Sequence, residues 1–211
     1  MQRSSAEMRV VEIFTSFQGE GKHQGARCTF LRLAGCNLAC RWCDTPDAQN
    51  DDAGDEISTE QIIAGIRSSG VRYLCVTGGE PLLHMDELLP VLQTLSGEDY
   101  RIEIETNGTI PFTQVLPYAS VCMDVKCPSS GERSDLSLLA DLRQNDTVKF
   151  VVADETDLTY ADEQIRSHRI AGEIFISPVF GSDYSAIARA LITWDHPIRL
   201  QMQLHKQIGV Q

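Results

Sequence analysis

The chain has 211 residues and a formal net charge of −12 at pH 7. This length fits one domain that buries about 70% of the surface of its unfolded chain. The negative charge argues against a general nucleic-acid-binding surface, which needs a positive field. No apolar run approaches the about 18 residues of a membrane span, and no charged and then apolar leader opens the chain. We therefore expect a single cytoplasmic domain over residues 1–211, with neither nucleic acid nor membrane as a partner.

The first part of the chain predicts two strands, a loop and a helix. Apolar residues at 8–14 and 28–33 indicate the strands, and the glycine-containing segment between them is either a ligand-binding loop or an ordinary hairpin loop. Residues 46–56 are rich in Asp, Asn, Gly and Pro, which predicts a loop. A capping box that begins at Ser58 starts a helix with apolar residues at helical spacing, and Gly70 ends it.

The rest of the chain repeats one pattern, a short apolar strand followed by a helix or a loop. This alternation is typical of parallel βα units whose sheet is covered on both faces. Six units are too few to close an eight-stranded barrel, so we predict an α/β fold with an open, partial (β/α) barrel of about six mostly parallel strands. The predicted strands are residues 73–76, 101–105, 120–126, 147–152, 173–178 and 198–203, and the predicted helices are 85–95, 135–143, 158–168 and 184–192.

Polar residues collect where the predicted strands end. They are Cys36, Thr77, Glu105, Lys126 and Ser177. In parallel α/β folds the ligand binds at the carboxyl ends of the strands. We therefore expect the functional site at this edge of the sheet.

Three of the seven cysteines, Cys36, Cys40 and Cys43, lie within eight residues. The other four sit singly, as small core residues of a reduced protein do, so we do not predict a disulfide framework. Three clustered thiols suit a zinc ion or an iron–sulfur cluster. A structural zinc site needs four ligands, usually as two pairs, and no second pair follows. On a four-iron cluster, three thiolates would leave one iron open to a small molecule.

Residues 77–81 read Thr-Gly-Gly-Glu-Pro and follow a predicted strand. The two glycines expose amide N–H donors and let the main chain lie against a ligand, although the segment alone could be a simple turn. Together with the Cys-x3-Cys-x2-Cys spacing, it resembles the motifs of the radical S-adenosylmethionine (SAM) superfamily. The resemblance implies a 4Fe-4S cluster on Cys36, Cys40 and Cys43. Its open iron chelates SAM, and its electron cleaves SAM to methionine and a 5′-deoxyadenosyl radical.

Nearly the whole chain resembles one family of this superfamily, the 7-carboxy-7-deazaguanine synthases. The resemblance rests on residues 12–21, 30–38, 42–45, 77–81, 104–108 and 199–206. It implies the conversion of 6-carboxy-5,6,7,8-tetrahydropterin to 7-carboxy-7-deazaguanine, with release of ammonia and regeneration of SAM. It also implies a requirement for Mg²⁺ with the hydroxyl of Thr45 as its protein ligand, the alternative for Thr45 being a helix N-cap or a loop hydroxyl.

The resemblance also implies which residues contact the small molecules. Arg32 is the only charge in an apolar strand, and its fork suits a carboxylate, a buried structural salt bridge being the alternative. Glu105, as an exposed carboxylate at a strand end, is the best candidate to accept hydrogen bonds from the SAM ribose. The implied substrate contacts are Phe17, Gln18, Gly19, Arg32, Thr77, His205 and the terminal Gln211. The implied SAM contacts are Trp42, Cys43, Asp44, Gly79, Glu105, Asp124, Val125 and Lys126.

Two other functions fit part of the pattern. A small radical SAM activase, which makes a glycyl radical on a protein partner, shares the cysteine spacing and the size, and a zinc- or cluster-binding regulatory module shares the cysteines alone. The Phe-Gln-Gly-Glu-Gly segment at 17–21 and the Gln-x-His-Lys tail at 203–206 favour the synthase. The expected partners are then a pterin substrate, an electron donor such as flavodoxin or ferredoxin, and, by family analogy alone, a second copy of the chain in a homodimer.

Overall fold

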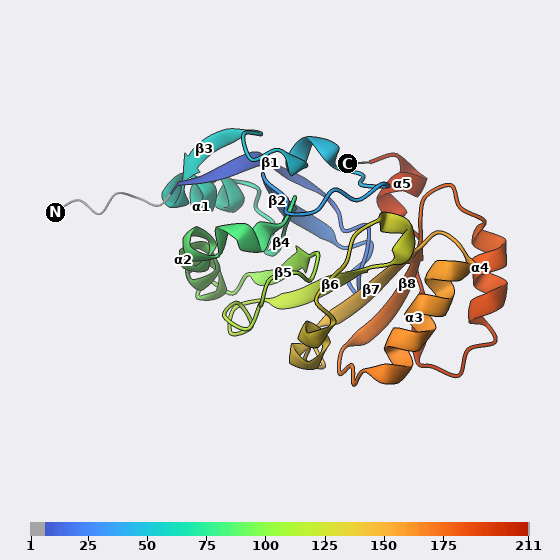
Figure 1. Cartoon of the computed structure of the whole chain (residues 1–211). Helices are drawn as coiled ribbons and strands as arrows, with labels where there is room; N and C mark the ends of the chain where they lie inside the picture. Colours follow the sequence, from blue (N-terminus) through green and yellow to red (C-terminus); the bar gives the residue numbers. More distant parts are fainter. Residues whose placement is uncertain (1–6, 211) are drawn as a thin grey trace.

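The computed structural model describes residues 7–210 and contains a nine-stranded sheet in the order β3-β1-β2-β4-β5-β6-β7-β8-β9 (Figure 1). Seven strands, β2 and β4 to β9, pair in parallel, whereas β1 pairs antiparallel with both β2 and β3. Within residues 7–210 the two edge strands, β3 and β9, do not pair with each other, so the barrel is open. The predicted α/β partial barrel is confirmed, with one more parallel strand than expected.

The elements alternate along the chain as predicted, and Figure 1 shows the helices arranged around the curved sheet. No helix within residues 7–210 is long and apolar enough to cross a membrane. The strands are β1 (Glu7–Phe17), β2 (Arg27–Leu33), β3 (Asp55–Ser58), β4 (Tyr73–Gly78), β5 (Arg101–Thr106), β6 (Ser120–Lys126), β7 (Thr147–Val152), β8 (Glu173–Pro178) and β9 (Ile198–Leu200). The α-helices are α1 (Thr59–Ser68), α2 (Met85–Ser96), α3 (Glu155–Ser167), α4 (Tyr184–Leu191) and α5 (Leu204–Ile208), and the 3₁₀-helices are η1 (Pro46–Gln49), η2 (Pro81–His84), η3 (Pro128–Ser130) and η4 (Leu136–Asp141).

The predicted capping box starts α1. The hydroxyl of Ser58 accepts a hydrogen bond from the Gln61 amide at 3.3 Å, and the Gln61 side chain accepts one from the Ser58 amide at 3.1 Å. The helix ends at Ser68, and Gly70 then turns the chain with a φ of +68°. The local sequence signals therefore predicted both ends of this helix to within two residues.

Three segments differ from the prediction. The predicted loop ends early, because residues 55 and 56 belong to β3, whose main chain pairs with β1. Residues 136–141 form a short 3₁₀-helix in place of an α-helix, started by the Asp135 carboxylate, which accepts from the Ser137 amide. The last strand stops at Leu200, and the residues after Gln203 form α5.

Side chains alternate between the two faces of the parallel strands, and the two faces have different chemistry. One face packs in the hydrophobic core with α1, α2 and α3, as Ile102 and Ile104 of β5 do. The opposite face carries Glu103 and Glu105 on the same strand, and Asp124 and Lys126 on β6 are likewise out of phase with the core. The strands therefore bring polar and charged groups together inside the open barrel.

Candidate active site

The inner face of the sheet and the loops at its carboxyl edge enclose a cavity of about 530 Å³. Every predicted site residue lines this cavity except Val125 and Gln211. Val125 is fully buried in the core, because it is one residue out of phase with Asp124 and Lys126. Its side chain therefore points away from the cavity, and the predicted contact of Val125 with SAM stays a prediction. Gln211 lies outside the described residues.

The cysteine loop follows β2 and forms one wall of the cavity. Cys36, Cys40 and Cys43 are free thiols that are partly exposed toward the cavity, whereas the other four cysteines are buried. Burial raises the pKa of the Cys40 thiol to about 11, and the Lys126 ammonium acts against this shift. The side-chain amide of Asn107 lies 3.8 Å from the Cys36 sulfur and donates toward it. Three open thiols on one wall, beside an amide donor, fit a 4Fe-4S cluster held by three ligands.

A closed zinc site does not form around these thiols. Among residues 7–210, three or more candidate ligand side chains lie within 4.8 Å of one another only at Cys75, Glu103 and Glu105. No fourth ligand completes a compact tetrahedral set with the three loop cysteines in that part of the chain. The donor set therefore favours a cluster with an open position over structural zinc.

Thr45 lines the cavity two residues after the last cysteine. It occupies the N-cap position of η1, but its side chain makes no capping hydrogen bond. Its hydroxyl lies 4.0 Å from the Cys43 sulfur. The N-cap alternative is thus not realised, and the hydroxyl stays a predicted ligand for Mg²⁺.

The glycine turn after β4 is packed against the start of the cysteine loop. The Gly79 amide donates to the Leu33 carbonyl at 3.0 Å, and the Glu80 amide donates to the Gly35 carbonyl at 2.7 Å. A Cβ on residue 79 would lie 1.9 Å from the Gly35 oxygen, so only glycine allows this approach. The Gly79 amide is therefore not a free N–H donor, because it is used within the protein. Gly78 and Gly79 both line the cavity.

Glu80 holds the glycine turn to the end of β5. Its fully buried carboxylate accepts from the Leu82 amide at 3.0 Å, the Thr106 hydroxyl at 2.9 Å and the Asn107 amide at 2.7 Å. Burial raises the pKa of this carboxyl to about 7 although these bonds lower it. Sequence reasoning gave Glu80 no role, and its role here is structural.

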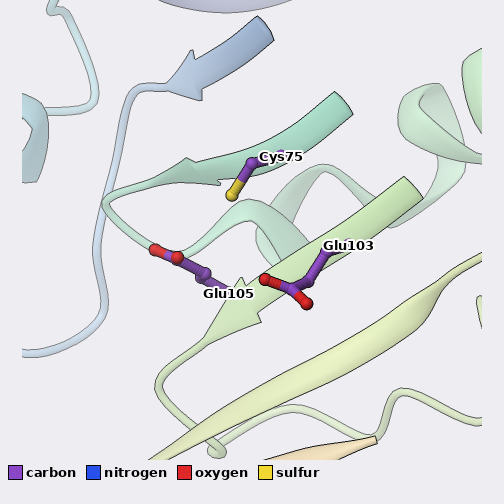
Figure 2. Close-up of side chains that lie close together, drawn as sticks. All are labelled: Cys75, Glu103 and Glu105. Carbon is purple, nitrogen blue, oxygen red and sulfur yellow. The ribbon is translucent and has the colours of Figure 1, made fainter. Parts of the chain in front are cut away.

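Gln18 and Glu105 form the floor of the cavity, and Cys75 and Glu103 lie next to them. Figure 2 shows Cys75 projecting from β4 toward Glu103 and Glu105, which project from β5. The Gln18 side-chain amide contacts all three, at 3.5 Å, 3.2 Å and 3.1 Å respectively. Burial and the neighbouring Glu105 raise the pKa of Glu103 to about 7. Gln18 is thus not part of an ordinary exposed hairpin loop, because it is only 2% exposed and its amide is fixed by carboxylates.

Glu105 is less exposed than predicted. It is half-buried, and besides Gln18 it accepts a hydrogen bond from the Thr77 hydroxyl at 3.1 Å. Both Glu105 and Thr77 line the cavity. The carboxylate is therefore oriented by two predicted substrate contacts, and it still faces the space that a ligand would occupy.

Arg32 makes the salt bridge that was the alternative to substrate binding. Its Nε donates to Glu12 at 2.8 Å, and its guanidinium lies 5.5 Å from the centre of the Phe14 ring. The Arg32 side chain is 15% exposed and lines the cavity. A salt bridge that uses Nε holds the planar guanidinium in place without removing Arg32 from the cavity wall.

Alternating charges line the cavity from the loop after β1 to β6. Lys126 donates to Asp124 at 2.8 Å and lies 5.5 Å from the centre of the Trp42 ring. Lys149 of β7 lies 3.9 Å from Asp124 and forms an ion pair with Glu20. Sequence reasoning missed Lys149, although it is the only charge in a strand of buried residues, the same signal that singled out Arg32.

The tail closes one side of the cavity. Lys206 lies 3.1 Å from the Asp44 carboxylate, and His205 lies 3.8 Å from it. Burial acts to raise the pKa of Asp44, but His205 and Lys206 hold it well below its usual range. The His205 ring lies against Gly19, where a Cβ would come within 2.0 Å of Nδ1. The tail therefore lies against both the cysteine loop and the segment after β1.

Comparisons with known proteins agree with this geometry. Residues 31–120 match the profile of the Radical SAM superfamily. The chain is 48% identical over 206 residues to the 7-carboxy-7-deazaguanine synthase of Methanospirillum hungatei JF-1, covering 98% of this chain and 87% of the relative. It is 34% identical to the enzyme of the same name from Koribacter versatilis, covering 95% of this chain and 96% of the relative.

A solved structure is similar as well. The crystal structure of QueE from Escherichia coli matches with a TM-score of 0.77 and 26% identity, covering 94% of this chain and 95% of that one. The match extends over nearly the whole of both chains. The Methanospirillum hungatei relative is 48% identical over 98% of this chain. This chain therefore belongs to the 7-carboxy-7-deazaguanine synthase family of the radical SAM superfamily.

Proposed function

We propose that this protein converts 6-carboxy-5,6,7,8-tetrahydropterin to 7-carboxy-7-deazaguanine with release of ammonia. The observation that carries the proposal is that the three open thiols, the glycine turn and the Gln18–Glu105 floor line one cavity. The names of the relatives supply the product. Neither the activase nor the regulatory module is favoured by these relatives.

Cys36, Cys40 and Cys43 would hold the 4Fe-4S cluster, which, once reduced by an electron donor, would supply the one electron for cleavage of SAM to methionine and a 5′-deoxyadenosyl radical. The carbonyl oxygens of the glycine turn accept hydrogen bonds from the amino group of SAM. Glu105 accepts from the ribose hydroxyls, and its contact with Thr77 keeps the carboxylate in place for that task.

The substrate binds on the opposite side of the cavity. The Arg32 guanidinium pairs with the substrate carboxylate, since it is held in the cavity wall by Glu12 and its fork matches a carboxylate. Gln18, Gly19 and Phe17 contact the ring system. Thr45 supplies one neutral oxygen to Mg²⁺, a weak site alone, so the ion binds together with the substrate. His205 and Lys206 keep water out on the tail side.

The test is anaerobic turnover. Protein reconstituted with iron and sulfide is incubated with SAM, a reductant such as reduced flavodoxin, Mg²⁺ and 6-carboxytetrahydropterin. We expect a deazapurine product, one equivalent of ammonia per product and no net consumption of SAM. A matched reaction without the pterin should give only slow SAM cleavage.

Two outcomes would contradict the proposal at different levels. Cleavage of SAM without a deazapurine product would exclude the synthase activity and leave the superfamily chemistry. A colourless protein with one zinc and no iron would exclude the cluster itself. The molar mass of the same sample, measured by light scattering, tests the expected homodimer.

A further inference from the structure

Lys149 is a buried ammonium in the middle of β7. It is 6% exposed, and both of its neighbours in the strand, Val148 and Phe150, pack in the core on the other face of the sheet. Burial acts to lower its pKa, but the Glu20 and Asp124 carboxylates raise it well above the usual range, so the group is charged. A buried charge is retained only where partners of opposite charge compensate for the loss of water.

The main partner of Lys149 lies 129 residues away in the sequence. Nζ donates to one carboxylate oxygen of Glu20, and the Gln203 side-chain amide donates to the other at 2.6 Å. Glu20 follows Gln18 and Gly19 directly, and all three lie in the segment after β1 that lines the cavity. One carboxylate therefore joins this segment to β7 on one side and to the tail on the other.

Asp124, the second partner of Lys149, is also paired with another lysine. Asp124 is 3.9 Å from Nζ of Lys149 but only 2.8 Å from Nζ of Lys126. Removal of the Lys149 charge would leave Asp124 paired with Lys126, whereas the Glu20 carboxylate would keep, among the described residues, only the neutral side-chain amide of Gln203 as a donor. The consequences of losing Lys149 should therefore fall on the segment of residues 17–21.

We propose that Lys149 is a positioning residue that holds Gln18 and Gly19 at the floor of the cavity through its ion pair with Glu20. It acts through Glu20 and has no chemical step of its own. The kinetic test of this inference rests on the proposed function. The order of residues 17–21 can also be measured directly, without turnover.

The kinetic test uses the reconstituted holoenzyme and the variants Lys149→Met, Glu20→Gln and the double variant. Lys149→Met should raise the KM for 6-carboxytetrahydropterin at least about tenfold, the effect expected when a buried charge loses its partner. The affinity for SAM, measured without the pterin, should change less than about threefold because Asp124 keeps Lys126. In the Glu20→Gln background, Lys149→Met should add less than about threefold to KM, because the two residues act as one unit.

A purely structural role is separated by a matched control. Arg143 pairs with the fully buried Asp146 at 2.9 Å, and neither residue lines the cavity. Arg143→Met should lower Tm by an amount similar to that of Lys149→Met and leave KM unchanged. An equal rise of KM in both variants, an unchanged KM in Lys149→Met, or independent effects of Lys149→Met and Glu20→Gln would each overturn the inference.

The second readout needs no turnover. Hydrogen exchange of the holoenzyme should become at least about tenfold faster in a peptide spanning residues 17–21 of Lys149→Met, with no such change in Arg143→Met. If the wild type makes no deazapurine, the proposed function fails while this measurement still tests the inference. Unchanged exchange in residues 17–21 would overturn the role of Lys149 whatever the reaction is.

Discussion

The glycine turn can be tested with Gly79→Ala. The new Cβ would lie 1.9 Å from the Gly35 oxygen and 2.7 Å from the Ala48 oxygen, which are both main-chain atoms. Ordinary contact begins at 3.4 Å, so the turn and residue 35 must move apart by 3.4 − 1.9 = 1.5 Å. Forced overpacking of this kind costs about 1–3 kcal/mol of stability. It also lengthens the 2.7 Å hydrogen bond from the Glu80 amide to the Gly35 carbonyl.

The same displacement reaches the cluster loop, because Gly35 directly precedes Cys36. A misplacement of about 1 Å between reacting groups costs about 100-fold in rate. We therefore expect SAM cleavage by Gly79→Ala holoenzyme to fall at least about 100-fold while the thiols still bind iron. The assay is 5′-deoxyadenosine formation by chromatography, with iron content and Tm measured on the same sample.

Gly97→Ala is the matched control. Residue 97 caps α2 with a φ of −65°, and its Cβ would meet main-chain oxygens at ordinary distances of 3.4 and 3.5 Å. This variant should keep the Tm and the rate of SAM cleavage of the wild type. If Gly79→Ala behaved like Gly97→Ala in both measurements, the close approach of the turn to residue 35 would not constrain the site and the reasoning would be refuted.

Three further predictions concern single groups of the cavity. Cys36→Ala, Cys40→Ala and Cys43→Ala should each abolish turnover with the fold retained in circular dichroism, and full activity in any of them would exclude that thiol as a ligand. Thr45→Ala should weaken the response of turnover to Mg²⁺, and an unchanged magnesium titration would argue against its ligand role. Burial and Glu105 raise the pKa of Glu103 from 4.5 to about 7, so the native state holds a proton that the unfolded chain releases in this window, and stability falls as the pH rises from 4.5 through 7. Glu103→Gln should remove up to about 3 kcal/mol of this fall in the free energy of unfolding between about pH 5 and about pH 8, measured by urea unfolding of the apoprotein. If the free energy of unfolding of the variant and the wild type depended on pH in the same way, Glu103 would ionise normally.

Signals that act within a few residues predicted the fold well. The capping box of α1 needs only Ser58 and Gln61, and the alternation along the strands needs only the identity of neighbouring residues. β3 was missed because it is polar and forms through main-chain pairing with β1, which side-chain patterns do not show. α5 was missed because the main chain at its start is engaged by a distant segment, the Leu204 amide donating to the Gly19 carbonyl at 3.0 Å. Contacts between distant segments therefore limited the prediction of elements.

The same limit applies to the cavity. The cysteines and the glycine turn lie in short motifs, and the structure places both at one wall. The Gly79 amide was expected to be free, but it donates to the carbonyl of Leu33, which lies on another strand and is not visible in the local sequence. The partner of Lys149 is 129 residues away, so a lone charge in the strand gave no hint of what it holds. The core position of the Val125 side chain, by contrast, follows from the alternation of β6, which is a local signal.

The position of α5 has a practical consequence for handling the protein. α5 lies at the red end of the colour scale in Figure 1, and its His205 and Lys206 line the cavity. A label attached to α5 would therefore disturb residues packed against Gly19 and Asp44. At the other end, the exposed Glu7 begins β1 and does not line the cavity. Fluorescent labels and surface-immobilisation handles therefore belong at exposed positions such as Glu7 and not on α5.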